Sequence, residues 1–225
     1  MKWPQLDEFA ALVPLPAGYQ WMQLDRALVA PLIQALQVWH PTISIGVASA
    51  YLQEAFYEEK VCLDGRDDKD IFAAVISFKG ELVGFWSTER EVDSLAIYGR
   101  LLVLAAAHRG SKLSVQIMNG ATDLGRAMGA QFHYALATLS IPHVQRTMES
   151  AGYQLLGFFP GYDREEVAPG VVKRVYHAVY GRLLVPKSEV HWPDPQNMSP
   201  HARALFALLF EGETVGGTPE VNAIE

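Results

Sequence analysis

The chain has 225 residues, half of them hydrophobic, with a formal net charge of −7 and a pI near 5.5. This length and apolar content suffice for one main domain with a well-buried core. The acidic balance argues against a general nucleic-acid-binding or anionic-membrane surface, because both require clustered basic charge. We therefore expect neither a nucleic acid nor a membrane as a partner.

Cysteine and histidine usage argues against disulfide and metal chemistry. Cys62 is the single cysteine, so no intrachain disulfide and no thiolate metal site can form, and a reducing cytoplasm is the expected compartment. His191 and His201 lack metal-ligand spacing. Residues 1–18 have Pro and acidic residues where a signal peptide needs a basic start and an apolar run. We expect them to form an arm lying on the domain.

The elements predicted next are a strand, two helices and a hairpin. Residues 19–24 suit a strand, and Asp25 caps a helix with apolar side chains on one side. A second helix is expected over residues 48–60. Residues 71–91 are rich in β-branched and aromatic side chains, which is typical of a hairpin, and its turn is Lys79-Gly80.

An apolar run then joins a basic turn and a helix. Leu101–Ala107 carry no polar side chain, as expected of a strand buried on both faces. At the start of the helix that follows, the first backbone N–H groups lack partners and the dipole is positive, so a pyrophosphate fits there. The side chains of Arg109 and Lys112 would add positive charge. The alternative is plain scaffolding, since strand–turn–helix units occur in any α/β protein.

The second half of the chain predicts three strands and one helix. A strand is expected over residues 132–140, a helix over 141–153, and a further strand over 154–163. Residues 161–170 read as an acidic loop and residues 171–185 as the last strand. The core order is therefore strand, helices, hairpin, strand, helix, strand, helix, strand, strand.

Residues 186–225 differ in composition and are expected to form an extension with one short helix. Pro-rich residues connect to a helix that starts at Ser199-Pro200, with Leu205, Leu208 and Leu209 to bury. A helix this short is not stable alone, so we expect it to dock on the domain or on a second subunit of a homodimer. Residues 212–225 are expected to be frayed.

The segments from Arg100 to Gly129 and from Phe132 to Glu166 resemble the GNAT superfamily of acyl-CoA-dependent N-acyltransferases. Its acyl-CoA signature is Gln or Arg, two free positions, Gly, one free position, and Gly or Ala, after a central strand. The hexapeptide RGSKLS at 109–114 keeps the Arg but has Lys112 and Ser114 where small residues are usual. The downstream strand–helix–strand order, with an Ala-Gly-Tyr helix exit, also matches. The resemblance spans roughly residues 19–185.

This resemblance implies a fold, a co-substrate and a set of cofactor contacts. The fold is α/β (α+β), with a mixed, mostly antiparallel central sheet flanked by helices. The co-substrate is acetyl-CoA or another acyl-CoA, with no metal. The family's central strand splays from its neighbour and pairs with the pantetheine arm, and the turn binds the pyrophosphate. The implied contacts are Leu102, Val103, Leu104, Arg109, Gly110, Ser111, Lys112, Leu113 and Ser114.

The residues at the positions of the family's usual general base and general acid differ from the family's pattern. Where the family often has a Glu on the central strand, the nearest residues here are Tyr98 and Arg100, and Met148 stands in place of the usual Tyr acid. The substitute catalytic candidates are Tyr98, Glu91 and His133, and histidine suits proton transfer near neutral pH. His133 also reads as a core histidine, and Glu91 as part of a solvated strand end. A solvent-deprotonated amine would need no base.

The predicted acceptor site takes residues from the hairpin and from the acidic loop. Trp86, Glu89, Tyr162 and Asp163 are the candidates: aromatic side chains for an apolar pocket, and carboxylates for a substrate cation. The same aromatic residues are equally consistent with a core, and the carboxylates with a solvated turn.

The sequence thus predicts an N-acyltransferase that moves an acetyl or similar group from acyl-CoA to a primary amine, in a small molecule or a peptide, by direct attack in a ternary complex. One alternative is a catalytically weak acyl-CoA-binding sensor or interaction protein with this fold, favoured by Arg100, Lys112 and Met148. Another is an unrelated nucleotide-binding α/β protein, which would have a fully parallel sheet.

Overall fold

The computed structural model describes residues 1–210 and divides the chain into two units, Met1–Val185 and Pro186–Glu225. The segment expected to be frayed, 212–225, lies outside the described residues. No described helix is long and apolar enough to cross a membrane.

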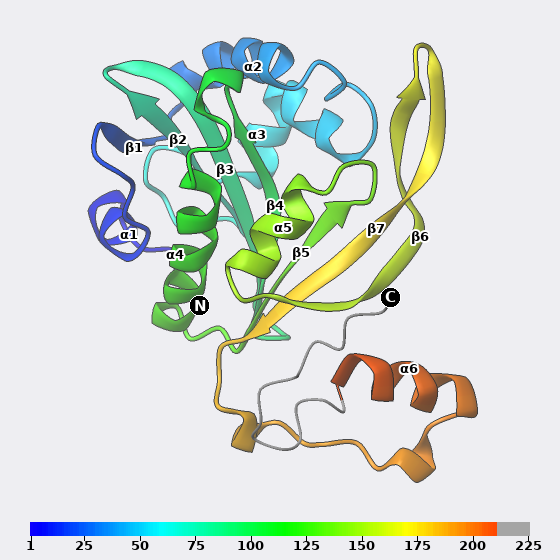
Figure 1. The fold of residues 1–225 in the computed structure, drawn as a ribbon. Coiled ribbons are helices and arrows are strands. Elements are labelled where there is room, and N and C mark those ends of the chain that lie inside the picture. Colours follow the sequence, from blue (N-terminus) through cyan, green and yellow to red (C-terminus); the bar gives the residue numbers. More distant parts are fainter. Residues whose placement is uncertain (211–225) are drawn as a thin grey trace. The chain divides into compact units, whose positions relative to one another are not determined.

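The first unit is built on a seven-stranded sheet with the strand order β1-β2-β3-β4-β5-β7-β6 (Figure 1). All neighbouring strands pair antiparallel except β4 and β5, which are parallel. The predicted mixed, mostly antiparallel sheet is therefore confirmed, and the fully parallel alternative is wrong. The strands are β1 (Tyr19–Gln23), β2 (Ile71–Phe78), β3 (Glu81–Glu91), β4 (Ala96–Leu104), β5 (Phe132–Thr138), β6 (Gln154–Ala168) and β7 (Val171–Leu183).

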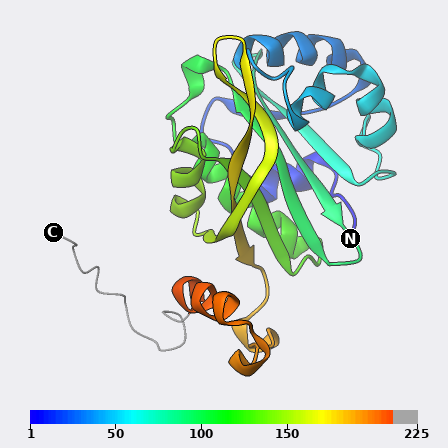
Figure 2. The same ribbon diagram turned by 90° about the vertical axis from the view of Figure 1, so that its right-hand side faces the viewer.

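Helices cover both faces of this sheet. Figure 2 shows the layer of α2 and α3 on one side of the strands and the layer of α4 and α5 on the other. The α-helices of this unit are α1 (Leu6–Leu12), α2 (Arg26–Trp39), α3 (Glu54–Lys60), α4 (Leu113–Ala127) and α5 (His143–Ser150), with 3-10 turns η1 (Val47–Leu52) and η2 (Ala106–His108).

The N-terminal segment, expected as an arm, carries α1 and contributes to the core. Phe9 is fully buried and packs its ring against Trp86, with centroids 5.5 Å apart and planes 13° apart, and against Trp21 at 4.9 Å. Trp3 is also buried. Burial of an aromatic side chain is among the largest single contributions to a core.

Two local predictions are confirmed at the atomic level. The Asp25 side chain accepts a hydrogen bond from the Leu28 backbone N–H at 2.9 Å and caps α2. Lys79 and Gly80 both have positive φ, 52° and 86°, which is the geometry of the tight turn that matches the twist of two paired strands.

Three predicted elements differ from the structure. The helix expected over 48–60 is divided into η1 and α3 at Gln53. The strand expected over Leu101–Ala107 ends at Leu104, and Ala106 and Ala107 are exposed in η2. The loop expected over 161–170 is strand to Ala168, because Asp163 to Ala168 pair with β7 and the turn is confined to Pro169-Gly170.

The second unit contains η3 (Lys187–Glu189), η4 (Pro195–Asn197) and α6 (Pro200–Phe210). Trp192 packs against Phe206 with ring centroids 5.0 Å apart, and Arg203 donates to the Pro195 carbonyl at 3.0 Å. Leu208 is 82% exposed. Docking of α6 on the domain or on a second subunit stays a prediction.

His133, a predicted catalytic residue, lies in the core of the domain. It is fully buried, and its Nδ1 is 2.6 Å from the Tyr153 hydroxyl. Burial, with a smaller contribution from the positive charge of Arg182, lowers the pKa of His133 to about 3. A neutral, enclosed imidazole cannot exchange protons with a substrate, so the geometry supports the core interpretation.

We predict that Phe9→Ala lowers the free energy of unfolding by about 3–5 kcal/mol, because it removes a fully buried aromatic ring. Glu8→Ala, on the exposed side of the same helix, is the matched control. Urea denaturation of both variants measures the difference. Equal midpoints for the two variants would show that residues 1–18 are a dispensable arm.

We also predict that His133 makes the stability of the folded domain sensitive to acid. Its folded pKa of about 3 lies below the ordinary value of 6.5, so the unfolded chain binds the proton more readily. The contribution of His133 to the free energy of unfolding is fully present above pH 6.5. It falls by about 1.4 kcal/mol per pH unit as the pH drops toward 3. His133→Gln should flatten this part of the stability profile, whereas exposed His143→Gln should not. Parallel profiles for both variants would contradict the assignment.

Candidate functional site

The site begins where β4 and β5 separate. Their parallel pairing covers only Ala96–Gly99 and Phe132–Ala135. Beyond Gly99, β4 continues to Leu104 with β3 as its single partner strand. The other edge of β4 therefore presents backbone N–H and C=O groups that no neighbouring strand binds, which is a ready surface for an extended ligand.

Register shifts mark two residues beside this separation. Ser87 pairs with Leu101 and Thr88 with Gly99, so Arg100 is the extra residue of a bulge in β4. The pairing of β6 with β7 jumps from Phe159 to Asp163, and Tyr162 lies in that gap. Bulges re-aim side chains and are frequent next to active sites.

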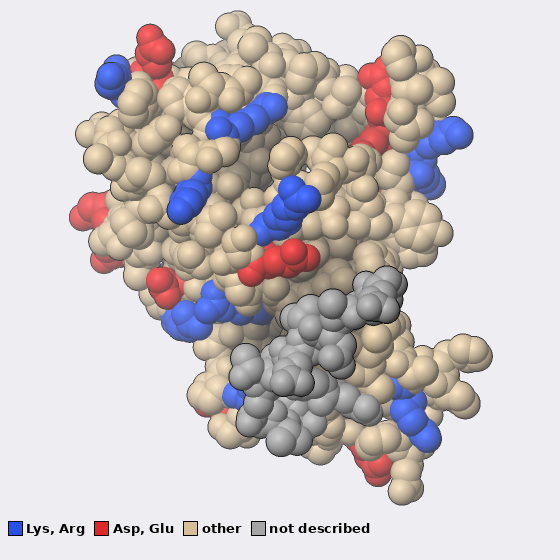
Figure 3. Space-filling model, in the orientation of Figure 1, with Lys and Arg blue, Asp and Glu red and all other residues tan. Residues whose placement is uncertain are grey.

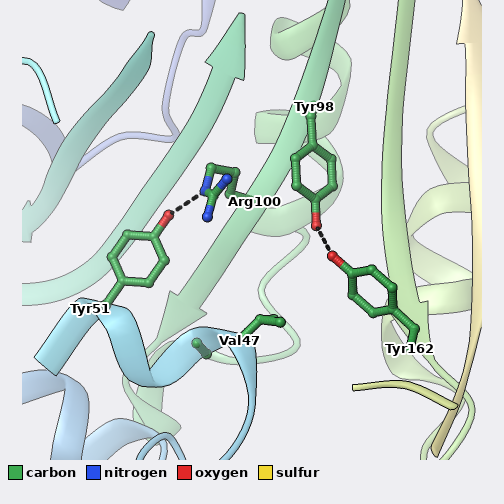
Figure 4. A pocket seen from close by; sticks show the side chains of 6 residues that line it. Val47, Tyr51, Tyr98, Arg100 and Tyr162 are labelled. Carbon is green, nitrogen blue, oxygen red and sulfur yellow. Dashed lines mark hydrogen bonds between the residues drawn. The ribbon is translucent and has the colours of Figure 1, made fainter. Parts of the chain in front are cut away.

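A cavity of about 100 Å³ lies at this point, and elements distant in the sequence line it. The 3-10 turn η1 contributes one wall, β4 a second, and β6 a third (Figure 4). The lining residues are Val47, Ala48, Tyr51, Tyr98, Arg100 and Tyr162. The predicted candidates Tyr98 and Tyr162 are thus brought together, and their hydroxyl oxygens are 3.5 Å apart.

A hydrogen-bond network fixes Arg100 in the cavity wall. Its Nε donates to the Tyr51 hydroxyl at 3.2 Å, and that hydroxyl lies 2.6 Å from Ser87 Oγ. Nη1 of Arg100 donates to the Glu89 carboxylate. Burial alone lowers the pKa of Arg100, but Tyr51 and Glu89 raise it above its usual value, so the guanidinium stays charged.

Tyr98 connects the cavity to a second carboxylate. Its ring stacks on Tyr134 with centroids 5.0 Å apart, and the Tyr134 hydroxyl donates to Glu91 at 2.6 Å. Burial and the neighbouring Tyr162 raise the pKa of Tyr98, so it stays a neutral hydrogen-bond donor at neutral pH. Glu91 is therefore bound to Tyr134 and is not among the residues that line the cavity.

The turn before α4 has the backbone of an anion cradle. Gly110 and Lys112 have φ of 76° and 59°, and within the described residues the backbone N–H groups of 110–114 bind no backbone carbonyl. Lys112 is exposed. Arg109 instead donates to the carbonyls of Leu104, at 3.0 Å, and Trp39, at 2.5 Å, so it holds the turn against the end of β4.

Other predicted acceptor residues lie elsewhere or are already bound. Trp86 is 2% exposed and packs on Phe9, in the core cluster on the α4 side of the sheet, so it does not reach the cavity. Glu89 is neutralised by Arg100. Asp163 Oδ1 accepts from the backbone N–H of Val47 at 2.9 Å, which joins β6 to η1.

The sequence analysis missed the η1 wall. Ala48 and Tyr51 fall in the single helix predicted over residues 48–60, and Val47 was assigned to no element, whereas the structure divides this segment into η1 and α3 at Gln53. Met148, at the place of the family's usual acid, is 4% exposed in the core. Among the described residues, no group of His, Cys, Asp and Glu is placed to hold a metal ion.

Surface charge does not concentrate on the face that α4 and α5 cover. Figure 3 shows Lys and Arg side chains lying singly on this face, with Asp and Glu side chains between them. This distribution differs from the continuous basic surface that tracks a nucleic-acid backbone.

No protein-family model and no curated protein matches the sequence. Solved structures do match. RimL, a ribosomal alpha-N-protein acetyltransferase in complex with coenzyme A, has a TM-score of 0.61 at 12% identity, over 76% of this chain and 97% of that chain. Spermidine N-acetyltransferase from Vibrio cholerae, in complex with CoA and spermine, has a TM-score of 0.59 at 13% identity, over 75% of this chain and 96% of that chain.

MccE, the microcin C7 self-immunity acetyltransferase in complex with acetyl-CoA and AMP, gives a TM-score of 0.57 at 13% identity, over 77% of this chain and 99% of that chain. These likenesses agree with the mixed sheet and with the single parallel strand pair. The chain has the GNAT acetyltransferase fold.

Proposed function

We propose that this protein is a GNAT-type N-acyltransferase that moves an acetyl group from acetyl-CoA to a primary amine by direct attack in a ternary complex. The observation that carries the proposal is the free edge of β4 from Arg100 to Leu104. It joins a cradle of unbound N–H groups at one end to a cavity at the other. The fold neighbours in complex with CoA or acetyl-CoA support the choice of co-substrate.

The residues of the turn fit a pyrophosphate. Backbone N–H groups at a helix start bind anions without any particular side chain, so Lys112 in the left-handed conformation keeps the cradle open where the family has a small residue. The backbone of Leu102, Val103 and Leu104 would provide the pairing edge for the pantetheine arm, since β5 leaves that edge free, and the Leu104 carbonyl at its end is bound to Arg109.

The chemistry requires one bond exchange and two proton transfers. The amine forms a C–N bond with the acyl carbon, the C–S bond breaks, the amine loses a proton and the thiolate gains one. Tyr98 and Tyr162 present hydroxyl groups at the cavity, which would donate hydrogen bonds to developing negative charge. Their role is hydrogen bonding, because the raised pKa of Tyr98 makes it a poor acid.

A catalytically weak acyl-CoA-binding protein is the second candidate. It is favoured by the placement of Met148 and His133 in the core, which keeps both residues away from the cavity. An amine deprotonated by solvent removes the need for a base, and catalysis then rests on positioning.

A thiol-release assay with acetyl-CoA and a panel of amines tests the proposal against the second candidate. Release of CoA that depends on an amine, with the acetylated amine identified by mass spectrometry, supports the transferase. Calorimetric binding of CoA with no turnover on any amine favours the sensor. Absence of CoA binding overturns both.

We predict that Arg109→Ala combined with Lys112→Ala weakens CoA binding about tenfold or more, because a charge-assisted phosphate contact is worth about 1.5–3 kcal/mol and because Arg109 holds the turn. Lys112→Gly tests the charge alone, since glycine keeps the left-handed backbone. Exposed Lys60→Ala on α3 is the control. Unchanged calorimetric affinity in the double variant would remove the pyrophosphate from this turn.

A further inference from the structure

The cavity beside the β4–β5 separation has an unusual charge for an amine acceptor site. Its lining consists of three tyrosines, two small apolar residues and Arg100. No carboxylate lines it, and Glu89 approaches the guanidinium from outside the lining. Among the described residues that line the cavity, the single formal charge is that of Arg100, which pairs with Glu89 outside the lining, and no lining carboxylate is placed to bind a cationic acceptor, which disfavours one.

Arg100 is held in place before any ligand arrives. Its Nε is bound to the Tyr51 hydroxyl, and Tyr51 is 2% exposed and anchored on Ser87. Nη1 is bound to Glu89. A long side chain fixed in this way has already lost its conformational entropy, so a ligand gains the full benefit of the contact.

One edge of the guanidinium remains open. Within the part of the chain that the structure describes, Nη2 of Arg100 has no hydrogen-bond partner, and the side chain is 23% exposed. Figure 4 shows the guanidinium directed between Tyr51 and Val47, with Tyr98 and Tyr162 across from it. A planar guanidinium with open N–H groups is matched in geometry and charge by a carboxylate.

We propose that the acceptor is an amino acid or a similar amine that carries a carboxylate, and that Arg100 binds this carboxylate through Nη2. The inference rests on the proposed acyltransfer function and specifies its acceptor. The amine end extends toward the free edge of β4, which leaves the Tyr98 and Tyr162 hydroxyls for the acyl group. The guanidinium is then shared between Glu89 and the substrate.

A matched panel of amines tests the proposal. Glycine, β-alanine and γ-aminobutyrate are each compared with an alkylamine of equal carbon number, with the diamine putrescine and with phosphoethanolamine. The expected result is that the best amino acid exceeds its matched alkylamine and putrescine at least about tenfold in kcat/KM. Equal or better acetylation of putrescine or of phosphoethanolamine overturns the proposal.

Substitution of Arg100 tests whether this residue causes the preference for an amino acid over its matched alkylamine. In Arg100→Gln the advantage of the amino acid over the alkylamine should disappear, mainly through KM, while Arg100→Lys should keep part of it because the charge remains. Arg126→Gln on α4, paired with Asp123 away from the cavity, is the control. Unchanged CoA affinity confirms that each variant is folded. A preference that persists in Arg100→Gln contradicts the assignment.

A binding measurement separates failure of this inference from failure of the proposed function. Calorimetry with each amine, with and without CoA, needs no turnover. Tighter binding of an amino acid than of its alkylamine, lost in Arg100→Gln, supports the carboxylate site even if no acetyl transfer occurs. Transfer to amines without any preference for a carboxylate overturns this inference and leaves the acyltransferase intact.

Discussion

The parallel pairing of β4 with β5 stops after Gly99 and Ala135, and the arrangement of the whole site follows from that point. The two strands are unusually close at their last pair, because a Cβ added to Gly99 would lie 3.1 Å from the Cβ of Ala135. The next residue, Arg100, is bulged. A strand that bulges immediately after a tight pair turns away from its neighbour, which leaves its backbone free.

Burial divides the titratable groups of this region into two sets. His133 and Tyr153 bind each other in the core between β5 and the α4–α5 layer, where they stabilise packing and are closed to solvent. Tyr51, Tyr98 and Tyr162 line the cavity on the opposite face, together with the charge of Arg100. The polar chemistry of the site is therefore that of hydroxyl and guanidinium donors, which suits stabilisation of negative charge more than abstraction of protons.

Local sequence signals predicted the elements well and the side-chain environment poorly. The cap at Asp25 and the turn at Lys79-Gly80 depend on neighbouring residues only, so the sequence contains all that is needed. The strand character of residues 161–168 depends on pairing with β7, which no local pattern reveals.

The residues that form the site were likewise hard to predict from the local sequence. Trp86 and Tyr162 are both strand aromatics, and only the tertiary fold places one against Phe9 and the other in the cavity. The side to which each residue points depends on bulges that one sequence does not mark. The turn before α4 was predictable because it follows from a strand–turn–helix in continuous sequence, whereas the cavity takes its walls from three separate segments.

The hydrogen bond from Val47 to Asp163 joins the two halves of the sheet outside the ladder of four residue pairs between β4 and β5, as the Tyr98–Tyr162 hydroxyl contact does across the cavity. The Val47–Asp163 bond is exposed, and it is close-fitting, since Asp163 Oδ1 lies 2.3 Å from the position of a Cβ at Gly46. Because Val47 and Tyr162 both line the cavity, this bond fixes the spacing of the η1 and β6 walls. A side chain at position 46 would collide with Asp163 and disturb that spacing.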